Sequence, residues 1–227
     1  MVAAASLLAV GATAQDSSLP GSQPKGNWGT VISETDGGHR IGNPNAEAKL
    51  VEYMSYTCSH CAHFAQTGEG AIKLLYVPTG KVSYEVRHLI RDQIDLTAAL
   101  AVRCGEPGKF FGNHQALNFK FDEWMAIASK ATPAQQARWN FGTFPSRAQA
   151  IASDLGFYEI MERRGYSRAQ LDSCLTDFDE AKAIANRSNA DIDRLGLRGT
   201  PTFFMSGKEL DAHNWQGLQP VLDSLFK

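Results

Sequence analysis

The apolar pattern of residues 48–87 predicts a strand, a helix and a second strand. Residues 48–54 form a short apolar run that is typical of a buried strand, and apolar residues then recur at intervals of three and four, which indicates one face of a helix. That face consists of Cys61, Phe64, Ala65, Gly68, Ile72 and Leu75. Residues 82–87 alternate apolar and polar side chains, which predicts a strand with one covered face. This order indicates the start of a parallel α/β unit.

The segment before this unit predicts little regular structure. Residues 28–33 are read as a short strand, Gly37-Gly38 as a turn, and the residues through Asn43-Pro44 as a loop. Residues 15–27 are rich in Ser, Pro and Gly, which is typical of a linker. Residues 1–14 combine a short apolar run with the small-residue pattern of a cleavage site, so we expect an export signal there. No Lys or Arg precedes the run, so the signal would be incomplete; the alternative is an ordinary N-terminal segment.

Residues 92–177 have an almost wholly helical pattern. Three segments match the capping box, in which a Ser or Thr opens a helix and a Gln three residues later supports it. They are Thr132–Gln135, Ser146–Gln149 and Ser167–Gln170. Pro133 suits the first position of a helix, and Gly156 and Gly165 are typical of helix ends.

The sheet pattern resumes after one more long helix. The apolar face of that helix is expected at Phe178, Ala181, Ala185, Ser188, Ile192 and Leu195. Residues 202–205 predict a buried strand, residues 208–210 its partner, and residues 215–225 an amphipathic helix. We therefore predict an α/β domain, formed by residues 28–91 and 178–227, which an all-helical insertion domain at 92–177 interrupts.

Composition narrows the class of protein. The 227 residues carry a net charge of −2 and no basic run, which gives no basis for nucleic-acid binding. No apolar stretch approaches the roughly 20 residues that a membrane-spanning helix needs. Four cysteines permit two disulfides; the short spacing pairs Cys58 with Cys61 and leaves Cys104 with Cys174 as a structural bridge, unless the latter two are inert core thiols.

Cys58-Ser59-His60-Cys61 lies where the predicted strand passes into the helix. Cys61 falls on the apolar face, so its thiol should be buried. Cys58 should lie exposed at the helix start, where free backbone N–H groups and the positive end of the helix dipole favour a thiolate. One thiol that attacks and a second that resolves are the parts of a redox-active dithiol.

The run from Val51 to Cys61, with Gly199-Thr200-Pro201-Thr202-Phe203 near the C-terminus, resembles the DsbA-like branch of the thioredoxin superfamily over about residues 28–227. The resemblance implies a thioredoxin fold with a helical insertion. It also implies a periplasmic oxidase that donates its disulfide to reduced, unfolded exported proteins. A quinone-linked membrane protein similar to DsbB would re-oxidise it. No metal or organic cofactor is implied, because the disulfide carries the electrons, and we expect a monomer.

The same resemblance suggests roles for single residues. Cys58 would be the nucleophile and His60 would tune its thiolate, while Ser59 departs from the Pro common in the best-known relatives. Thr200-Pro201 matches the loop that carries a cis proline, and its backbone could pair with an extended substrate. Glu52 resembles the buried acid below the disulfide and would handle protons; the alternative is a carboxylate on a solvent-facing strand position.

Three alternatives stay open. Within the same fold, the protein could be a disulfide isomerase or reductase. A metal-binding module could use the closely spaced side chains of Cys58, His60, Cys61 and His63. The aromatic-rich part of the insertion either packs a core or forms an apolar patch for unfolded chains. Its side chains are Trp124, Met125, Trp139, Phe141 and Phe144.

Overall fold

The computed structural model describes residues 26–227, so the expected export signal and nearly all of the expected linker lie outside the described residues. A six-stranded sheet has the order β1-β2-β4-β3-β5-β6. The strands are β1 (Ile32–Glu34), β2 (Gly38–Gly42), β3 (Ala48–Met54), β4 (Val82–His88), β5 (Thr202–Met205) and β6 (Lys208–Glu209). The central pair β3 and β4 is parallel, and the other neighbouring pairs are antiparallel.

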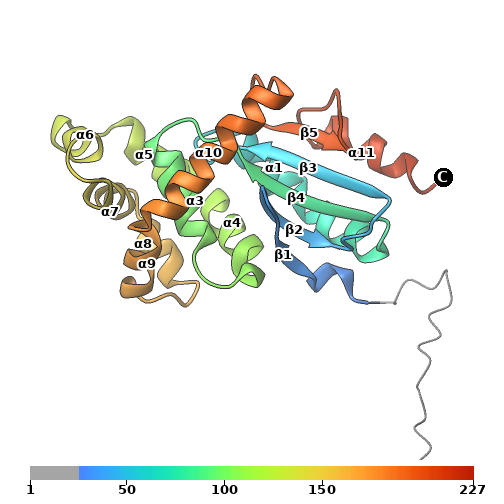
Figure 1. Ribbon diagram of the computed structural model, residues 1–227, viewed down its shortest axis with the longest axis horizontal. Coiled ribbons are helices and arrows are strands. Elements are labelled where there is room, and N and C mark those ends of the chain that lie inside the picture. The colour runs from blue at the N-terminus through green and yellow to red at the C-terminus, as the bar shows by residue number, and fades with distance from the viewer. Residues whose placement is uncertain (1–25) are drawn as a thin grey trace, which may run out of the picture.

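Helices cover the sheet and also gather into a cluster at one end of the molecule (Figure 1). Around the sheet lie α1 (Ser59–Thr67), α2 (Glu69–Ala71), α10 (Phe178–Leu195) and α11 (Trp215–Ser224). The insertion contributes α3 (Gln93–Arg103), α4 (Phe110–Phe119), α5 (Phe121–Ser129), α6 (Pro133–Asn140), α7 (Phe144–Asp154), α8 (Phe157–Glu162) and α9 (Arg168–Leu175). Short helical turns complete the described chain: η1 (Trp28–Thr30), η2 (Ile72–Tyr76), η3 (Val77–Thr79) and η4 (Pro107–Lys109). Within residues 26–227, no helix combines the length and apolar composition that crossing a membrane requires.

The central strands are buried on both faces, which corrects the expectation of one covered face for residues 82–87. Ser83 and Glu85 are buried like their apolar neighbours, because α10 runs across that face of the sheet (Figure 1). The helix turns Ala181, Ile184, Ser188 and Asp191 inward. The predicted face of α10 was therefore wrong in part, and Phe178 is exposed.

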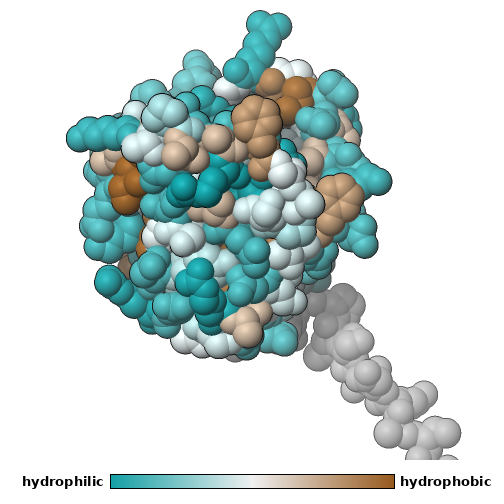
Figure 2. Space-filling model, turned by 90° about the vertical axis from the view of Figure 1, so that its left-hand side faces the viewer, coloured by the Kyte–Doolittle hydropathy of each residue, from teal (hydrophilic) through white to brown (hydrophobic). Residues whose placement is uncertain are grey.

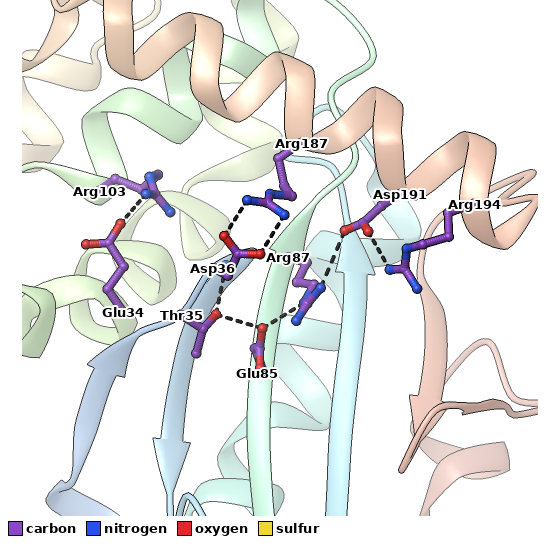
Figure 3. A network of polar contacts seen from close by, with 10 residues as sticks. Glu34, Thr35, Asp36, Glu85, Arg87, Arg103, Arg187, Asp191 and Arg194 are labelled. Carbon is purple, nitrogen blue, oxygen red and sulfur yellow. Dashed lines mark hydrogen bonds and ion pairs between the residues drawn. The ribbon is translucent and has the colours of Figure 1, made fainter.

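Ion pairs bind α10 to the strands below it (Figure 3). Arg87 of β4 bonds to Glu85 at 2.7 Å and reaches Asp191 of α10 at 3.5 Å. Asp191 also pairs with Arg194 on its own helix. Arg103 of α3 pairs with Glu34 of β1 and with Glu180 of α10, and Arg187 of α10 pairs with Asp36 in the turn between β1 and β2. The long helix is thereby held against the sheet through charged groups as well as through packing.

The first helix does not continue as one regular stripe. It ends at Thr67, a short turn restarts it at Glu69, and the segment from Ile72 is a π-helix. Ile72 is buried as expected, but a π-helix has more residues per turn than an α-helix, so the next buried residue is Tyr76. Leu75, expected on the buried face, is 65% exposed.

Local sequence signals predicted some helix starts and strands correctly and others wrongly. The capping boxes at Thr132 and Ser167 are confirmed, but the expected start at Ser146 was wrong. Thr143 caps α7 instead by accepting the N–H of Ser146, since Pro145 suits the first turn. Between residues 28 and 44, the described chain has a 3-10 turn followed by β1 and β2, where we expected one strand and a loop.

The predicted Cys104–Cys174 bridge is confirmed. The disulfide joins the C-cap of α3 to α9, with Cα atoms 5.5 Å apart and a sequence separation of 70. It fastens the first helix of the insertion to the last.

Candidate active site

Cys58 occupies the junction between β3 and α1. It is the N-cap residue of α1, with an extended backbone, and its Sγ lies 3.3 Å from the carbonyl oxygen of Thr200. The loop before it is held by Asp95 of α3, which accepts hydrogen bonds from Ser55 Oγ at 2.6 Å and from the Tyr56 N–H at 2.8 Å. Burial raises the pKa of Asp95 to about 7. The nucleophile is thus positioned from three separate segments.

The two thiols of the pair have opposite acidities. The pKa of Cys58 falls from 9.0 to about 5, chiefly because Cys61 hydrogen-bonds its sulfur, with further support from Thr200 and from the backbone N–H groups of Cys61 and His60. Burial acts against this shift. Burial also raises the pKa of Cys61 well above its usual value. Cys58 is therefore ionised at neutral pH while Cys61 keeps its proton, and both are free thiols here.

Two expectations about this helix start need correction. Cys58 was expected to be exposed, yet the residue is only 5% exposed, because its sulfur lies against the Thr200 carbonyl across the junction. His60 was expected to tune the thiolate with its ring, but the group that lowers the pKa of Cys58 is its backbone N–H. Ser59 is exposed as the first residue of α1.

The peptide bond between Thr200 and Pro201 is cis, as the resemblance implied. The two residues lie on the wall of a groove of about 920 Å³, which runs beside the start of α1. Many of the lining residues are polar, among them His60, Arg198 and His213. Cys58 adjoins the groove through its contact with Thr200.

Glu52 is confirmed as a buried acid in β3, 1% exposed, so the solvent-facing alternative was wrong. Tyr84 of the neighbouring strand donates a hydrogen bond to its carboxylate. Burial, and next the charge of Glu69, raise the pKa of Glu52 well above the usual value. The charge of Glu52 also raises the pKa of Cys61, which places this carboxyl within electrostatic reach of the resolving thiol.

The sequence analysis missed a second buried acid. Glu69 of α2 contacts His114 Nε2 through Oε1 at 2.6 Å and Lys73 Nζ through Oε2 at 3.1 Å. The other ring nitrogen of His114 lies 2.9 Å from the hydroxyl of Tyr56. Glu69 lies between two glycines, and this local sequence does not predict a buried residue. Glu69 is buried because the helix breaks after Thr67, which turns its side chain toward the core.

The remaining sequence alternatives lose support. Among residues 26–227, no three His, Cys, Asp or Glu side chains converge as metal ligands would. In the insertion, Trp124 and Trp139 are core residues, whereas Phe141 is 76% exposed. Figure 2 views the end of the molecule on which the helical cluster lies in Figure 1, and hydrophobic residues form separate spots there in a mainly hydrophilic surface.

Comparison with known proteins agrees with this geometry. A family model described as thioredoxin matches residues 34–224. A protein of Rickettsia typhi named as a protein-disulfide oxidoreductase is 26% identical over 184 residues, which are 81% of this chain. The chain spans about 60% of the length of that relative.

Solved structures share the fold. The crystal structure of a protein-disulfide isomerase from Novosphingobium aromaticivorans is 40% identical, with a TM-score of 0.81 over 86% of this chain and 100% of that one. Alpha-DsbA1 from Wolbachia pipientis is 23% identical, with a TM-score of 0.62 over 82% of this chain and 89% of its own. The chain therefore belongs to the thioredoxin family and has the DsbA-like form of its fold, in which a helical domain interrupts the α/β unit.

Proposed function

We propose that the protein is a thiol-disulfide oxidoreductase that passes the Cys58–Cys61 disulfide to reduced protein substrates. The observation that carries this proposal is the position of the Cys58 sulfur at the start of α1, hydrogen-bonded and beside an open groove. A substrate thiolate attacks Cys58 Sγ, and Cys61 leaves with the electron pair. A second substrate thiolate then attacks the mixed disulfide, which oxidises the substrate and leaves the reduced dithiol.

The acidity of Cys58 favours the oxidase direction. With a pKa of about 5, Cys58 is stabilised as a thiolate in the reduced enzyme at pH 7. Two pH units of such stabilisation correspond to ~60 mV in a two-electron couple, a figure that solvent reaching the sulfur reduces. A reduced form that is favoured in this way makes the disulfide a stronger oxidant. The disulfide itself would carry the electrons, without an organic cofactor.

We further propose that the enzyme works in the periplasm on exported proteins. The Cys104–Cys174 disulfide supports an oxidising compartment, where such structural bridges persist. The expected export signal at residues 1–14 points the same way. In this proposal a quinone-linked membrane protein re-oxidises the dithiol, and the enzyme acts as a monomer.

A disulfide isomerase is the second candidate. The relative from Novosphingobium, at 40% identity over the whole of its chain, is titled a protein-disulfide isomerase. An isomerase also uses a nucleophilic thiolate such as Cys58, but it must work from the reduced dithiol.

The redox potential of the Cys58–Cys61 pair in glutathione buffers separates these candidates. An oxidase should lie near the roughly −120 mV of DsbA and an isomerase near the roughly −180 mV of protein disulfide isomerase, whereas a value near the roughly −270 mV of thioredoxin would contradict both. Refolding of a reduced, disulfide-containing substrate and rearrangement of a scrambled one should be measured in parallel. A Cys58→Ser variant, which keeps the fold but lacks the nucleophile, is the control for both reactions.

A further inference from the structure

A buried row of polar groups leads from the resolving thiol toward the surface. Glu52 lies within electrostatic reach of Cys61 and accepts a hydrogen bond from Tyr84. The Tyr84 hydroxyl is also within hydrogen-bonding reach of Glu69. Glu69 pairs with Lys73, whose side chain is 15% exposed. The row thus joins two acids that lie on different elements, β3 and α2.

The two acids have unequal partners. Glu69 is held by Lys73 at 3.1 Å and by His114 at 2.6 Å. Burial alone would raise its pKa, but these partners outweigh burial and lower it to about 2. Among residues 26–227, the hydrogen-bond donor to the Glu52 carboxyl is the neutral hydroxyl of Tyr84. Two neighbouring buried carboxyls rarely both ionise, so an ionised Glu69 favours a proton on Glu52.

The other groups around Glu52 do not substitute for the charge of Glu69. Cys58 and Cys61, from the start of α1, add negative charge when ionised. Phe203 of β5 lies directly opposite Glu52 in the sheet and has no charge. The positive charge of Lys73 lowers the pKa of Glu52, whereas the negative charge of Glu69 raises it.

We propose that Glu69 is a positioning residue whose negative charge, partly balanced by Lys73, keeps on Glu52 the proton that Cys61 takes up when the disulfide opens. This inference rests on the proposed function. A substrate thiolate attacks Cys58 Sγ, the Cys58–Cys61 bond breaks, and its electron pair goes to Cys61. Cys61 then takes the proton of Glu52, which is left as a carboxylate and regains a proton from solvent. One disulfide is exchanged for another, so the step involves no net oxidation or reduction.

The structure predicts opposite effects for the two partners of the ion pair. Glu69→Gln removes a negative charge, so Glu52 should lose its proton at lower pH. Lys73→Met removes the positive charge, so Glu52 should keep its proton to higher pH. Each change should move the midpoint of the Glu52 titration by about one pH unit, the size expected for a close buried charge. A role limited to packing would not shift the two variants in opposite directions.

The experiment follows the Glu52 carboxyl by carbon-13 NMR in the reduced full chain, with Glu52→Gln identifying the signal. Glu123→Gln and Lys120→Met are matched controls, because they remove the same charges from an exposed pair on α5 and should leave the midpoint unchanged. Shifts in the same direction, or no shift with Lys73→Met, would overturn the proposal. If Glu69→Gln fails to fold, Lys73→Met still decides, since Lys73 is partly exposed.

The titration needs no substrate, so it decides on Glu69 independently of turnover. The pH profile of Cys61 attack on a Cys58 mixed disulfide gives the second readout. In Glu69→Gln and Lys73→Met this profile should move in the directions of the Glu52 titration. A profile that stays in place while the titration moves would overturn the role of Glu69 in the reaction, whereas failure of the potential measurement would bear on the proposed function alone.

Discussion

Cys58 and Cys61 differ in acidity although they belong to the same helix start. Cys61 keeps its proton because it is buried, and that proton is donated to Cys58 in the hydrogen bond that contributes most to lowering the pKa of Cys58. The backbone N–H groups at the start of α1 add to this effect. The acidity of one thiol therefore depends on the burial of the other.

We expect Cys61→Ala to raise the pKa of Cys58 from about 5 toward that of an ordinary thiol, because the largest stabilising hydrogen bond is lost. Thiolate absorbance near 240 nm, followed against pH, measures the change. His60→Ala should have a smaller effect, since the backbone N–H of residue 60 remains. An equal or larger rise in His60→Ala would mean that the imidazole ring is the main stabilising group.

Glu52→Gln should make the protein more stable at neutral pH and leave its stability nearly unchanged at pH 4. The folded pKa of Glu52 is raised, so its contribution is fully present below the unfolded value and is lost as pH rises. The advantage of the variant should therefore grow by about 1.4 kcal/mol per pH unit above about pH 4.5, until the native carboxyl ionises. Urea unfolding at several pH values tests this, and a constant difference would contradict it.

At the scale of elements, a disulfide and a hydrogen bond hold the first helix of the insertion to its later segments. Cys104 and Cys174 bridge the end of α3 to α9, and the hydroxyl of Tyr166 donates to the Cys104 carbonyl at 2.7 Å. α3 in turn places Asp95 under the active-site loop. The helix that supports the nucleophile is therefore the same helix that the disulfide secures.

Replacing Cys104 and Cys174 together by Ala should lower the free energy of unfolding by about 4 kcal/mol, because the bridge closes a 70-residue loop in the unfolded chain. Denaturant unfolding with Cys58 and Cys61 kept reduced measures the loss. The pKa of Cys58 in the folded double variant is the control for local damage and should stay near 5. A loss below 1 kcal/mol would show that the bridge adds little to stability.

At the scale of the whole molecule, buried histidines and buried acids oppose one another in their response to pH. Burial lowers the pKa of His39 to about 3 and that of His88 well below its usual value, with Arg103 adding to both effects. The ring nitrogens of His88 have no hydrogen-bond partner among residues 26–227. Glu52 and Asp95 shift the other way. The native state thus disfavours protonation of His39 and His88 and favours protonation of Glu52 and Asp95.

Burial of His88 should destabilise the protein as the pH falls. Below about pH 6.5 the unfolded chain binds a proton at His88, whereas the native state does not. The free energy of unfolding therefore decreases as the pH falls. His88→Phe should remove that loss, and its stability relative to the parent should grow by about 1.4 kcal/mol for each pH unit below 6.5. The slope, measured by urea unfolding from pH 7 to pH 5, separates this effect from any constant change in packing. Parallel profiles would contradict it.

The parent itself should show a flatter profile than its histidines alone would produce. Between about pH 4.5 and 6.5, His39 and His88 favour the unfolded state as pH falls, while Glu52 and Asp95 favour the native state. The balance exists only because four groups from different strands and helices are buried together.

Local patterns in the sequence were sufficient for much of the architecture. The apolar runs predicted β3 and β5, and the capping residues Thr132 and Ser167 marked two helix starts, because these signals depend on neighbours in the chain. The C-x-x-C spacing and the Thr200-Pro201 pair indicated the redox site. The strand β2 and the start of α7 were missed, since tertiary packing and Pro145 outweighed weak local preferences.

Tertiary structure alone decided the electrostatics of the site. No sequence pattern could show that Thr200 would cover Cys58, or that Glu69 and Glu52 would meet through Tyr84, because these contacts join residues far apart in the chain. The same holds for burial of Glu85 under α10. The sequence determined which chemical groups are present and where helices with a full capping box begin, whereas the fold decided the solvation of these groups and their charged neighbours. The pKa of each group depends on its solvation and on its charged neighbours.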